Sequence, residues 1–294
     1  MKMHDASKIQ ILVREAILSR FERMLAFEKD VAIGRDIEAV HQMRVFSRRL
    51  VAALTTFEQC FQKTQYRKVL QRVRRLTRAL GEVRDLDVQL DFLNHYMKRI
   101  PAHKRNGIIV LKRKLVVMRN HRRRLLLQTL RHVHTQVLLK DAMRLVFGSI
   151  RQCESLRSMM LSSLHDVQRK AEKRALVLRK AFTLLSLHRY RIALKKLRYR
   201  MEIFEPYFKK PYRKYLKKVR DTQTLLGNVQ DTRVWLNLLT SKTLRFTTKE
   251  NIGIKGLIAE RKRTQTSLIT TFRRQYKEFK KLQESIDFST LLKK

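Results

Sequence analysis

The chain has 294 residues, 44% of them hydrophobic, and its 68 Lys and Arg outnumber its 25 Asp and Glu, giving a formal net charge of +43. The hydrophobic content is enough for a folded core and excludes wholesale disorder. With only seven Gly and three Pro, the chain lacks the turn residues that sandwiches, barrels and doubly wound sheets need. We therefore expect an all-α protein.

Helical periodicity runs through the first half of the chain. We expect a first helix from Ala6 to about Lys29, with Gly34 after it. A second helix is predicted from Asp36, a plausible N-cap, to Phe61, with a 4-3-4-3 apolar stripe typical of a bundle helix. A third begins near Tyr66 and ends between 94 and 101, and a fourth covers about 104–146, with Gly148 as its stop.

The second half repeats the first. The stretch HQMRVFSRRL (41–50) returns as HRYRIALKKL (188–197), and LGEVRDLDVQLDFL (80–93) returns as LGNVQDTRVWLNLL (226–239). Such a repeat implies two equivalent units with approximate two-fold symmetry. We expect four-helix units over 1–150 and 151–294, with a boundary near 148–156. The predicted helices of the second unit are 157–183, 186–208, 211–243 and 250–284.

Each repeated stretch carries a basic face. His41, Arg44 and Arg48 are spaced i, i+3, i+7 and share one side of their helix, and the second unit repeats this with His188, Arg191, Lys195 and Arg198. Like charges on one helical face repel by roughly 0.2–0.5 kcal/mol per pair. A bound linear polyanion explains why two such faces occur at equivalent positions.

The helices that follow add further cations. They contribute Lys68, Arg72, Arg75 and Arg78 in the first unit, and Lys214, Lys218 and Arg220 in the second. If the units pack about their pseudo-two-fold axis, these side chains join in one cationic groove or pore. Arg would bind phosphate oxygens in a bidentate way, and Lys would act as a mobile charge. We interpret Asp85 and Asp231 as holding basic side chains in place.

These two motifs, each basic helix followed by LGxVxD, resemble the two halves of the CHAD domain, the conserved histidine α-helical domain. The resemblance covers nearly the whole chain. It implies a single domain over 1–294 built from two four-helix bundles, non-catalytic binding of inorganic polyphosphate in a basic central groove, and association with polyphosphate granules. The family's basic motif falls on His41, Arg44, Arg48, Arg49, His188, Arg191, Lys195 and Lys196.

The second LG motif departs from the first. Gln230 and Arg233 stand where the first unit has Arg84 and Asp87, so these positions are not expected to play symmetric roles. Some members of the family carry a triphosphate-tunnel domain with a Glu-x-Glu-x-Lys strand. Nothing in this chain matches that strand, and triphosphatase activity is not expected.

Other chemistry finds little support in the sequence. Cys60 and Cys153 make no disulfide framework or zinc spacing, and His165-Asp166 has no partner cluster. No P-loop or nucleophile motif occurs. We therefore expect no enzyme, metal or cofactor, and we expect Trp235 in the core.

The N-terminus does not resemble a secretory signal, and no apolar run reaches 18 residues. We therefore expect a cytoplasmic protein, and the family resemblance implies that it associates with polyphosphate granules.

Two alternatives remain open. A charge of +43 attracts DNA or RNA at low salt, so a general nucleic-acid-binding protein is the main competing function. An enzyme of phosphate metabolism that uses the histidines as acid–base groups is a weaker one. The runs at 122–124 and 261–263 are equally well explained as solvated faces.

Overall fold

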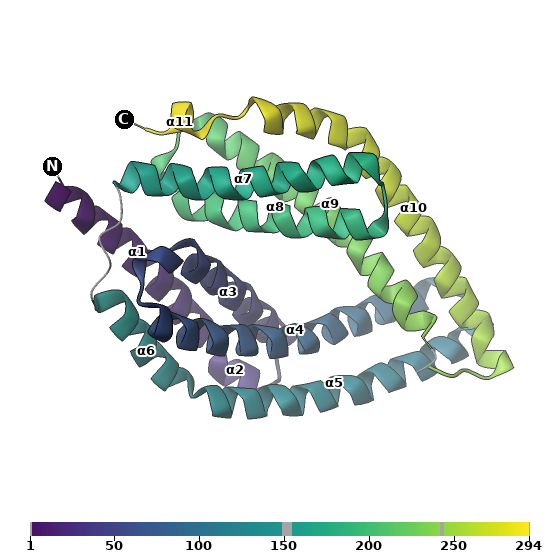
Figure 1. Cartoon of the computed structure of the whole chain (residues 1–294). Coiled ribbons are helices and arrows are strands. Elements are labelled where there is room, and N and C mark those ends of the chain that lie inside the picture. The colour runs from purple at the N-terminus through teal and green to yellow at the C-terminus, as the bar shows by residue number, and fades with distance from the viewer. Residues whose placement is uncertain (1, 149–154, 242–243, 294) are drawn as a thin grey trace. The chain divides into compact units, whose positions relative to one another are not determined.

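The computed structural model describes residues 2–148, 155–241 and 244–293. Most of these residues are helical and none lies in a strand, apart from an isolated bridge between Phe208 and Leu292. The all-α prediction is confirmed. The chain divides into two compact units, Met1–Leu156 and Arg157–Lys294 (Figure 1). The boundary predicted near 148–156 falls largely on residues 149–154. These residues, which include Cys153, lie outside the described residues.

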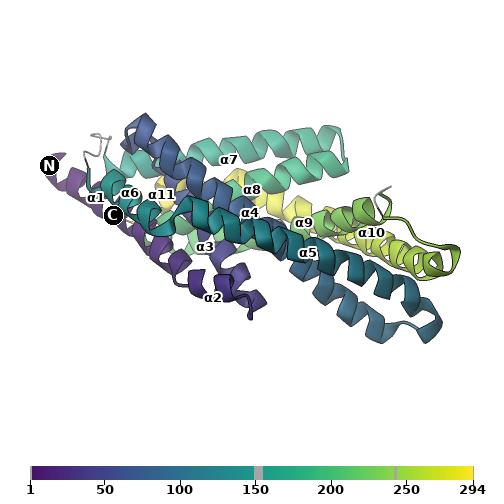
Figure 2. The same cartoon turned by 90° about the horizontal axis from the view of Figure 1, so that it is seen from below.

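The first unit is built around one long helical hairpin. Helix α4 packs on α3 on one side and along α5 on the other, and α3 in turn packs on α1 (Figures 1 and 2). Two 3-10 turns, Glu58–Cys60 and Ala102–Lys104, precede α4 and α5. The helices of this unit are α1 (Lys2–Leu25), α2 (Glu28–Ile33), α3 (Ile37–Thr56), α4 (Lys63–Arg99), α5 (Arg105–Val133) and α6 (Thr135–Phe147).

The predicted N-cap of α3 is confirmed. The Asp36 carboxylate accepts a hydrogen bond from the Glu38 backbone N–H at 2.7 Å, which satisfies one of the free donors at the helix start. The predicted extent was wrong at the other end, because α3 ends at Thr56 and a 3-10 turn follows. The prediction of a single first helix was also wrong. Helix α1 ends at Leu25, and α2 is a separate short helix that ends at Gly34, which has φ 76°.

The prediction of one helix over 104–146 was wrong as well. His134 has φ 44° and separates α5 from α6. The guanidinium of Arg72, from α4, donates hydrogen bonds to the carbonyls of Val133 and His134 and pairs with Asp141 at 2.6 Å. The break therefore depends on a side chain about 60 positions away, which replaces helical hydrogen bonds at the bend.

The second unit has the same sequence of long helices without these breaks. Helix α9 packs on α8 and along α10, and the short α11 returns to α9. Its helices are α7 (Leu156–Lys180), α8 (Leu184–Phe204), α9 (Lys210–Leu239), α10 (Thr248–Ser285) and α11 (Phe288–Leu291), with a 3-10 turn at Glu205–Tyr207. A capping box between Thr183 and Ser186 starts α8.

The two cores differ in composition. The largest fully buried side chains of the second unit are all aromatic, and they are Tyr190, Phe204, Phe208, Tyr212, Tyr215, Phe272 and Phe288. The corresponding set in the first unit contains Phe21 and Phe57 beside aliphatic residues and methionines. Trp235 is buried, as predicted. None of the described helices combines the length and apolar character needed to cross a membrane.

Candidate functional site

The first basic row lies on α3 and consists of His41, Arg44, Arg48 and Arg49. All four side chains are half-buried, whereas Met43, Ser47 and Leu50, on the adjacent face of α3, are in the core. The buried stripe fixes the rotation of α3, and this rotation places the row at the rim of the packing face.

His41 lies among positive charges. Its Nδ1 is buried and, among the described residues, has no hydrogen-bond partner. Burial lowers the pKa of the His41 imidazole, and the charges of Arg84, Arg44 and Arg48 lower it further against the opposing effect of Glu38. Arg84 belongs to α4, so the row already extends from one helix to its neighbour.

Arg44 also reaches α4. Its Nη2 donates to Asp85 Oδ1 at 3.2 Å, which confirms the predicted role of Asp85 in holding a basic side chain. Arg44 also passes close to Gly81, where an added Cβ would lie 3.4 Å from Arg44 Nε, an ordinary van der Waals distance. Arg49 points elsewhere, since its guanidinium lies 5.7 Å from the ring centroid of Phe46. The structure therefore groups His41, Arg44 and Arg48, and turns Arg49 away from them.

The second basic row lies on α8 and consists of His188, Arg191, Lys195, Lys196 and Arg198. His188 Nδ1 is 2.9 Å from Gln230 Oε1, on α9. Burial lowers the pKa of His188 and the hydrogen bond to Gln230 raises it, but the charges of Arg191, Arg233 and Lys195 leave it below its ordinary value.

Part of the second row is neutralised. Arg198 pairs with Glu202 at 3.3 Å and lies over the Tyr199 ring, and Arg220 reaches the same carboxylate at 3.4 Å. Lys218 pairs with Glu278 of α10 at 3.2 Å. The structure therefore groups His188, Arg191 and Lys195 around Gln230, and it places Arg198, Arg220 and Lys218 with carboxylates.

The remaining predicted site residues are open to solvent. The side chains of Lys196, Arg75, Arg78, Lys214 and also Lys68 are exposed on α8, α4 and α9. Exposed cations of this kind can follow a mobile anionic chain, but their positions are not fixed by packing.

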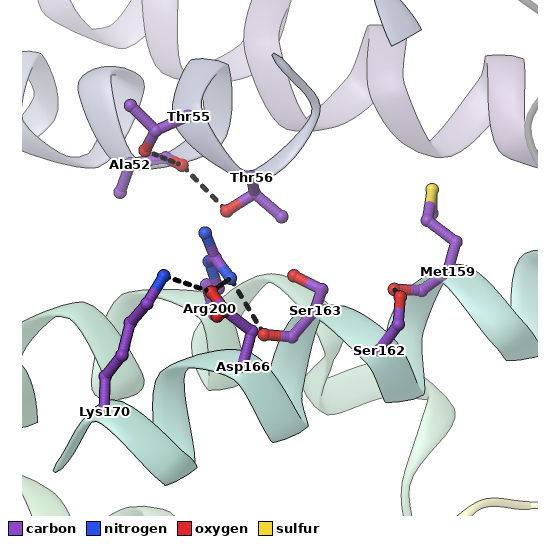
Figure 3. A network of polar contacts seen from close by, with 9 residues as sticks. All are labelled: Ala52, Thr55, Thr56, Met159, Ser162, Ser163, Asp166, Lys170 and Arg200. Carbon is purple, nitrogen blue, oxygen red and sulfur yellow. Dashed lines mark hydrogen bonds and ion pairs between the residues drawn. The ribbon is translucent and has the colours of Figure 1, made fainter. Parts of the chain in front are cut away.

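Several basic residues outside the rows have structural roles that the sequence did not reveal. Figure 3 shows Arg200 of α8 donating to the Ser163 carbonyl at 2.8 Å and to Asp166 at 3.3 Å, with Lys170 on the same carboxylate. Burial raises the pKa of Asp166, but Lys170 and Arg200 outweigh it and hold that pKa below its usual range. Asp166 therefore ties α7 to α8.

The basic run at 122–124 is likewise not simply solvated. Arg123 donates to the Ala32 and Ile33 carbonyls at the end of α2, and Arg122 pairs with Glu82 at 3.3 Å. Arg119 pairs with the buried Asp87.

The grouped side chains are suited to binding an anion. Arg, Lys and protonated His donate hydrogen bonds and accept none, so the rows offer donors and positive charge to phosphate-like oxygens. Across the described residues, no three His, Cys, Asp or Glu are grouped so that they could hold a metal ion.

Sequence reasoning did not recognise the positions that face the two histidines. Arg84 and Gln230 occupy equivalent places in the two LG motifs, one turn before the Asp87 and Arg233 positions. Their contact with the histidines depends on how α3 packs on α4 and α8 on α9. The one available signal was that these positions differ between otherwise similar motifs.

Comparison with known proteins identifies the family. The family model "CHAD domain" matches residues 15–240. The crystal structure of the CHAD domain from the plant Ricinus communis has a TM-score of 0.68 and 25% sequence identity, with 94% of this chain and 91% of that chain covered. PptA from Streptomyces chartreusis has a TM-score of 0.74 at 12% identity, covering 91% and 99% of the two chains, and supports the fold alone. A search of curated proteins gives no match.

Proposed function

Because the chain belongs to the CHAD domain family, we propose that it binds inorganic polyphosphate through its two basic rows and catalyses no reaction on it. The family resemblance supplies the ligand, and the rows supply the chemistry. We further propose that this binding brings the protein to polyphosphate granules. The joint groove or pore expected from the sequence stays a prediction.

The observation that carries the proposal is the concentration of positive charge around both histidines. His41 has Arg84, Arg44 and Arg48 as charged neighbours, and His188 has Arg191, Arg233 and Lys195. The side chains that fill the core on these helices, such as Met43 and Leu50 on α3, lie outside the two clusters. Like charges held together in half-buried positions repel one another, and a bound polyanion relieves that repulsion.

The donor types also fit a phosphate chain. A guanidinium can grip two oxygens of one phosphate, and a lysine can follow a flexible polymer. The Arg and Lys side chains in the rows are cations and hydrogen-bond donors, and they hold a phosphate chain by charge and hydrogen bonds. We therefore propose a binding module with no activity on the ligand.

General nucleic-acid binding is the alternative function, and the first experiment must distinguish it from polyphosphate binding. Labelled long-chain polyphosphate should be titrated at about 150 mM salt, where screening weakens non-specific contacts. Duplex DNA and single-stranded RNA are then added at equal phosphate concentration. We expect polyphosphate to stay bound. Equal competition by nucleic acid would mean that the +43 charge acts generically.

Paired variants test whether the rows form the binding site. Arg44→Ala with Arg191→Ala removes one grouped arginine from each unit, and two charged hydrogen bonds of about 1.5 kcal/mol each predict a loss of affinity of roughly a hundredfold. The matched control, Arg113→Ala with Arg263→Ala, removes the same charge from exposed positions of α5 and α10. Equal losses in the two double variants would place the ligand elsewhere.

The same preparations test the absence of catalysis. Incubation of the protein with polyphosphate should release no phosphate above the blank. Release that His41→Ala abolishes would establish an enzyme and overturn this part of the proposal.

A further inference from the structure

The two histidines have similar surroundings but opposite hydrogen-bond environments at Nδ1. His188 Nδ1 is 2.9 Å from Gln230 Oε1. His41 Nδ1 is buried and, within the described chain, has no partner. Arg84, which occupies the place of Gln230, supplies only donors and a positive charge.

The contact with Gln230 determines where His188 carries its proton. A carbonyl oxygen only accepts, so Nδ1 must carry the hydrogen and donate it to Oε1. In the neutral ring, Nε2 is then a bare acceptor. A phosphate oxygen is also an acceptor, so Nε2 can bind it only after taking up a proton.

The environment of His41 favours the other tautomer. A hydrogen on the buried Nδ1 would be an N–H group without an acceptor, which costs more than an unpaired lone pair. The neutral ring therefore keeps its hydrogen on Nε2. Protonation would also place a second positive charge beside Arg84. His41 can donate Nε2–H to an anion while it stays neutral.

We propose that Gln230 is a positioning residue that makes His188 a proton-dependent anion ligand, while Arg84 at the equivalent position keeps His41 a neutral Nε2–H donor. The tautomers follow from the packing of each unit. The statement that the anion is polyphosphate rests on the function proposed above.

The charged groups around each imidazole ring determine the pH range over which it takes up a proton. His188 faces Arg191 and Lys195 on its own helix and Arg233 on α9, and all three oppose its protonation. His41 faces Glu38, Arg44 and Arg48 on α3 and Arg84 on α4. A bound phosphate chain offsets these positive charges and raises the pKa of His188 in the complex.

The consequence is a pH dependence with a defined sign. The contribution of His188 to affinity is fully present below its pKa in the free protein and is lost as pH rises through its pKa in the complex. One charge-assisted hydrogen bond predicts a change in affinity of about tenfold over that interval. The contribution of His41 should not vary across it.

The tautomers can be measured without any ligand. Long-range proton–nitrogen correlation spectra of the histidine-labelled protein, assigned with His41→Gln and His188→Gln, distinguish Nδ1–H from Nε2–H rings at pH above both pKa values. We expect Nδ1–H for His188 and Nε2–H for His41. The same tautomer at both positions would overturn the proposal.

Substitutions at the facing positions separate positioning from simple packing. Gln230→Met keeps the size of the side chain but removes the acceptor, so His188 should convert to Nε2–H and the pH dependence of polyphosphate affinity should flatten. Gln230→Glu restores an acceptor and should recover the pH dependence with its midpoint at higher pH. An unchanged pH profile in Gln230→Met would overturn the positioning role.

The first unit supplies the reciprocal test. Arg84→Gln recreates the arrangement of the second unit and should give His41 an Nδ1–H tautomer, whereas Arg84→Met, which removes the same charge but adds no acceptor, should not. If the wild-type protein binds no polyphosphate at any pH, the proposed function fails, and the spectra still decide the tautomers. Identical spectra for the two Arg84 variants would overturn the inference.

Discussion

The two units keep the same basic positions on α3 and α8, yet they are built around different cores. In the second unit, α8, α9, α10 and α11 all contribute fully buried aromatic rings, and Tyr190 donates to Gln283 at 3.1 Å inside this cluster. The first unit fills the equivalent space largely with aliphatic side chains and methionines. The two units therefore fill the space between their helices with different kinds of side chain.

The basic rows and part of the core recur together. His41 and Arg44 return as His188 and Arg191, and the buried Leu50 and Phe57 return as Leu197 and Phe204, all at an offset of 147. Other buried positions of these helices change, since Met43 and Ser47 become Tyr190 and Leu194. The residues that do change beside the rows are Arg84 and Gln230, and these set the state of the histidines rather than the packing of the helices.

Breaking the aromatic core should have the largest effect. Phe288 is fully buried, and its ring contacts those of Phe208, Tyr212 and Tyr215. Phe288→Ala should lower the free energy of unfolding by about 3–5 kcal/mol, because it removes a large side chain and leaves a cavity. Urea unfolding followed by circular dichroism measures the change.

A matched control in the first unit is Phe147→Ala, since Phe147 is 53% exposed and contacts Arg14. Its cost should stay near 1 kcal/mol or less, as expected for an exposed cation–π contact. Phe288→Leu, which retains most of the volume, should fall between the two. A loss below about 1 kcal/mol for Phe288→Ala would show that the aromatic cluster is not what stabilises the second unit.

The equivalent glycines of the two LG motifs offer a smaller and sharper comparison. Gly81 and Gly227 both lie inside helices, where Ala is favoured over Gly by roughly 0.8–1 kcal/mol. A Cβ at Gly227 would meet nothing within 4 Å, whereas one at Gly81 would touch the Arg44 guanidinium. Gly227→Ala and Gly81→Ala should therefore both stabilise the protein, since neither added Cβ would come closer to another residue than an ordinary van der Waals distance.

Urea midpoints of the two glycine variants measure these stabilisations. Both variants should also keep the polyphosphate affinity of the wild-type protein, because a Cβ at position 81 leaves the Arg44 guanidinium in place. Destabilisation or a loss of binding in Gly81→Ala would show that Arg44 lies closer to Gly81 than 3.4 Å.

Much of the fold was predictable because it depends on local patterns. The apolar stripes and the cap at Asp36 lie within a few residues of the features they determine. The break at His134 was not predictable, because it depends on Arg72 from a distant part of α4. The roles of Arg200 and Arg123 were not predictable either. In the sequence they look like surplus positive charge, and only tertiary packing shows that they donate hydrogen bonds to the backbone carbonyls of Ser163 and Ala32.

The candidate site also contains features that the sequence predicts and features that it does not. The helical period was enough to group His41 with Arg44 and Arg48, but it also included Arg198, which the structure pairs with Glu202. The family resemblance added Arg49, whose guanidinium lies over the Phe46 ring. Which of the neighbouring basic residues joins a row depends on acidic and aromatic partners brought in from the same or adjacent helices, and the spacing of basic residues does not contain that information.

The smallest expected effect is a difference in acid sensitivity between the units. Burial raises the pKa of Asp87 even though Arg119 bonds to it at 2.9 Å, whereas Lys170 and Arg200 overcome burial to lower the pKa of Asp166. Between 3.8, the ordinary value, and its raised pKa, native Asp87 binds more protons than the unfolded chain, so stability falls as pH rises through that interval. Below 3.8 the unfolded chain binds more protons at Asp166, so its contribution is lost as pH falls through the lowered pKa.

Unfolding free energies measured from about pH 2.5 to 6 therefore separate the two carboxyls by the sign of a slope. Asp87→Asn should make stability rise more, or fall less, with pH above 3.8, and Asp166→Asn should flatten the rise below it. The comparison uses slopes and not absolute stabilities, because each substitution also weakens a contact with an arginine. If both variants changed the slope in the same way, the opposite pKa shifts would be contradicted. Burial would then not destabilise the Asp87 carboxylate while Lys170 and Arg200 stabilise the Asp166 carboxylate.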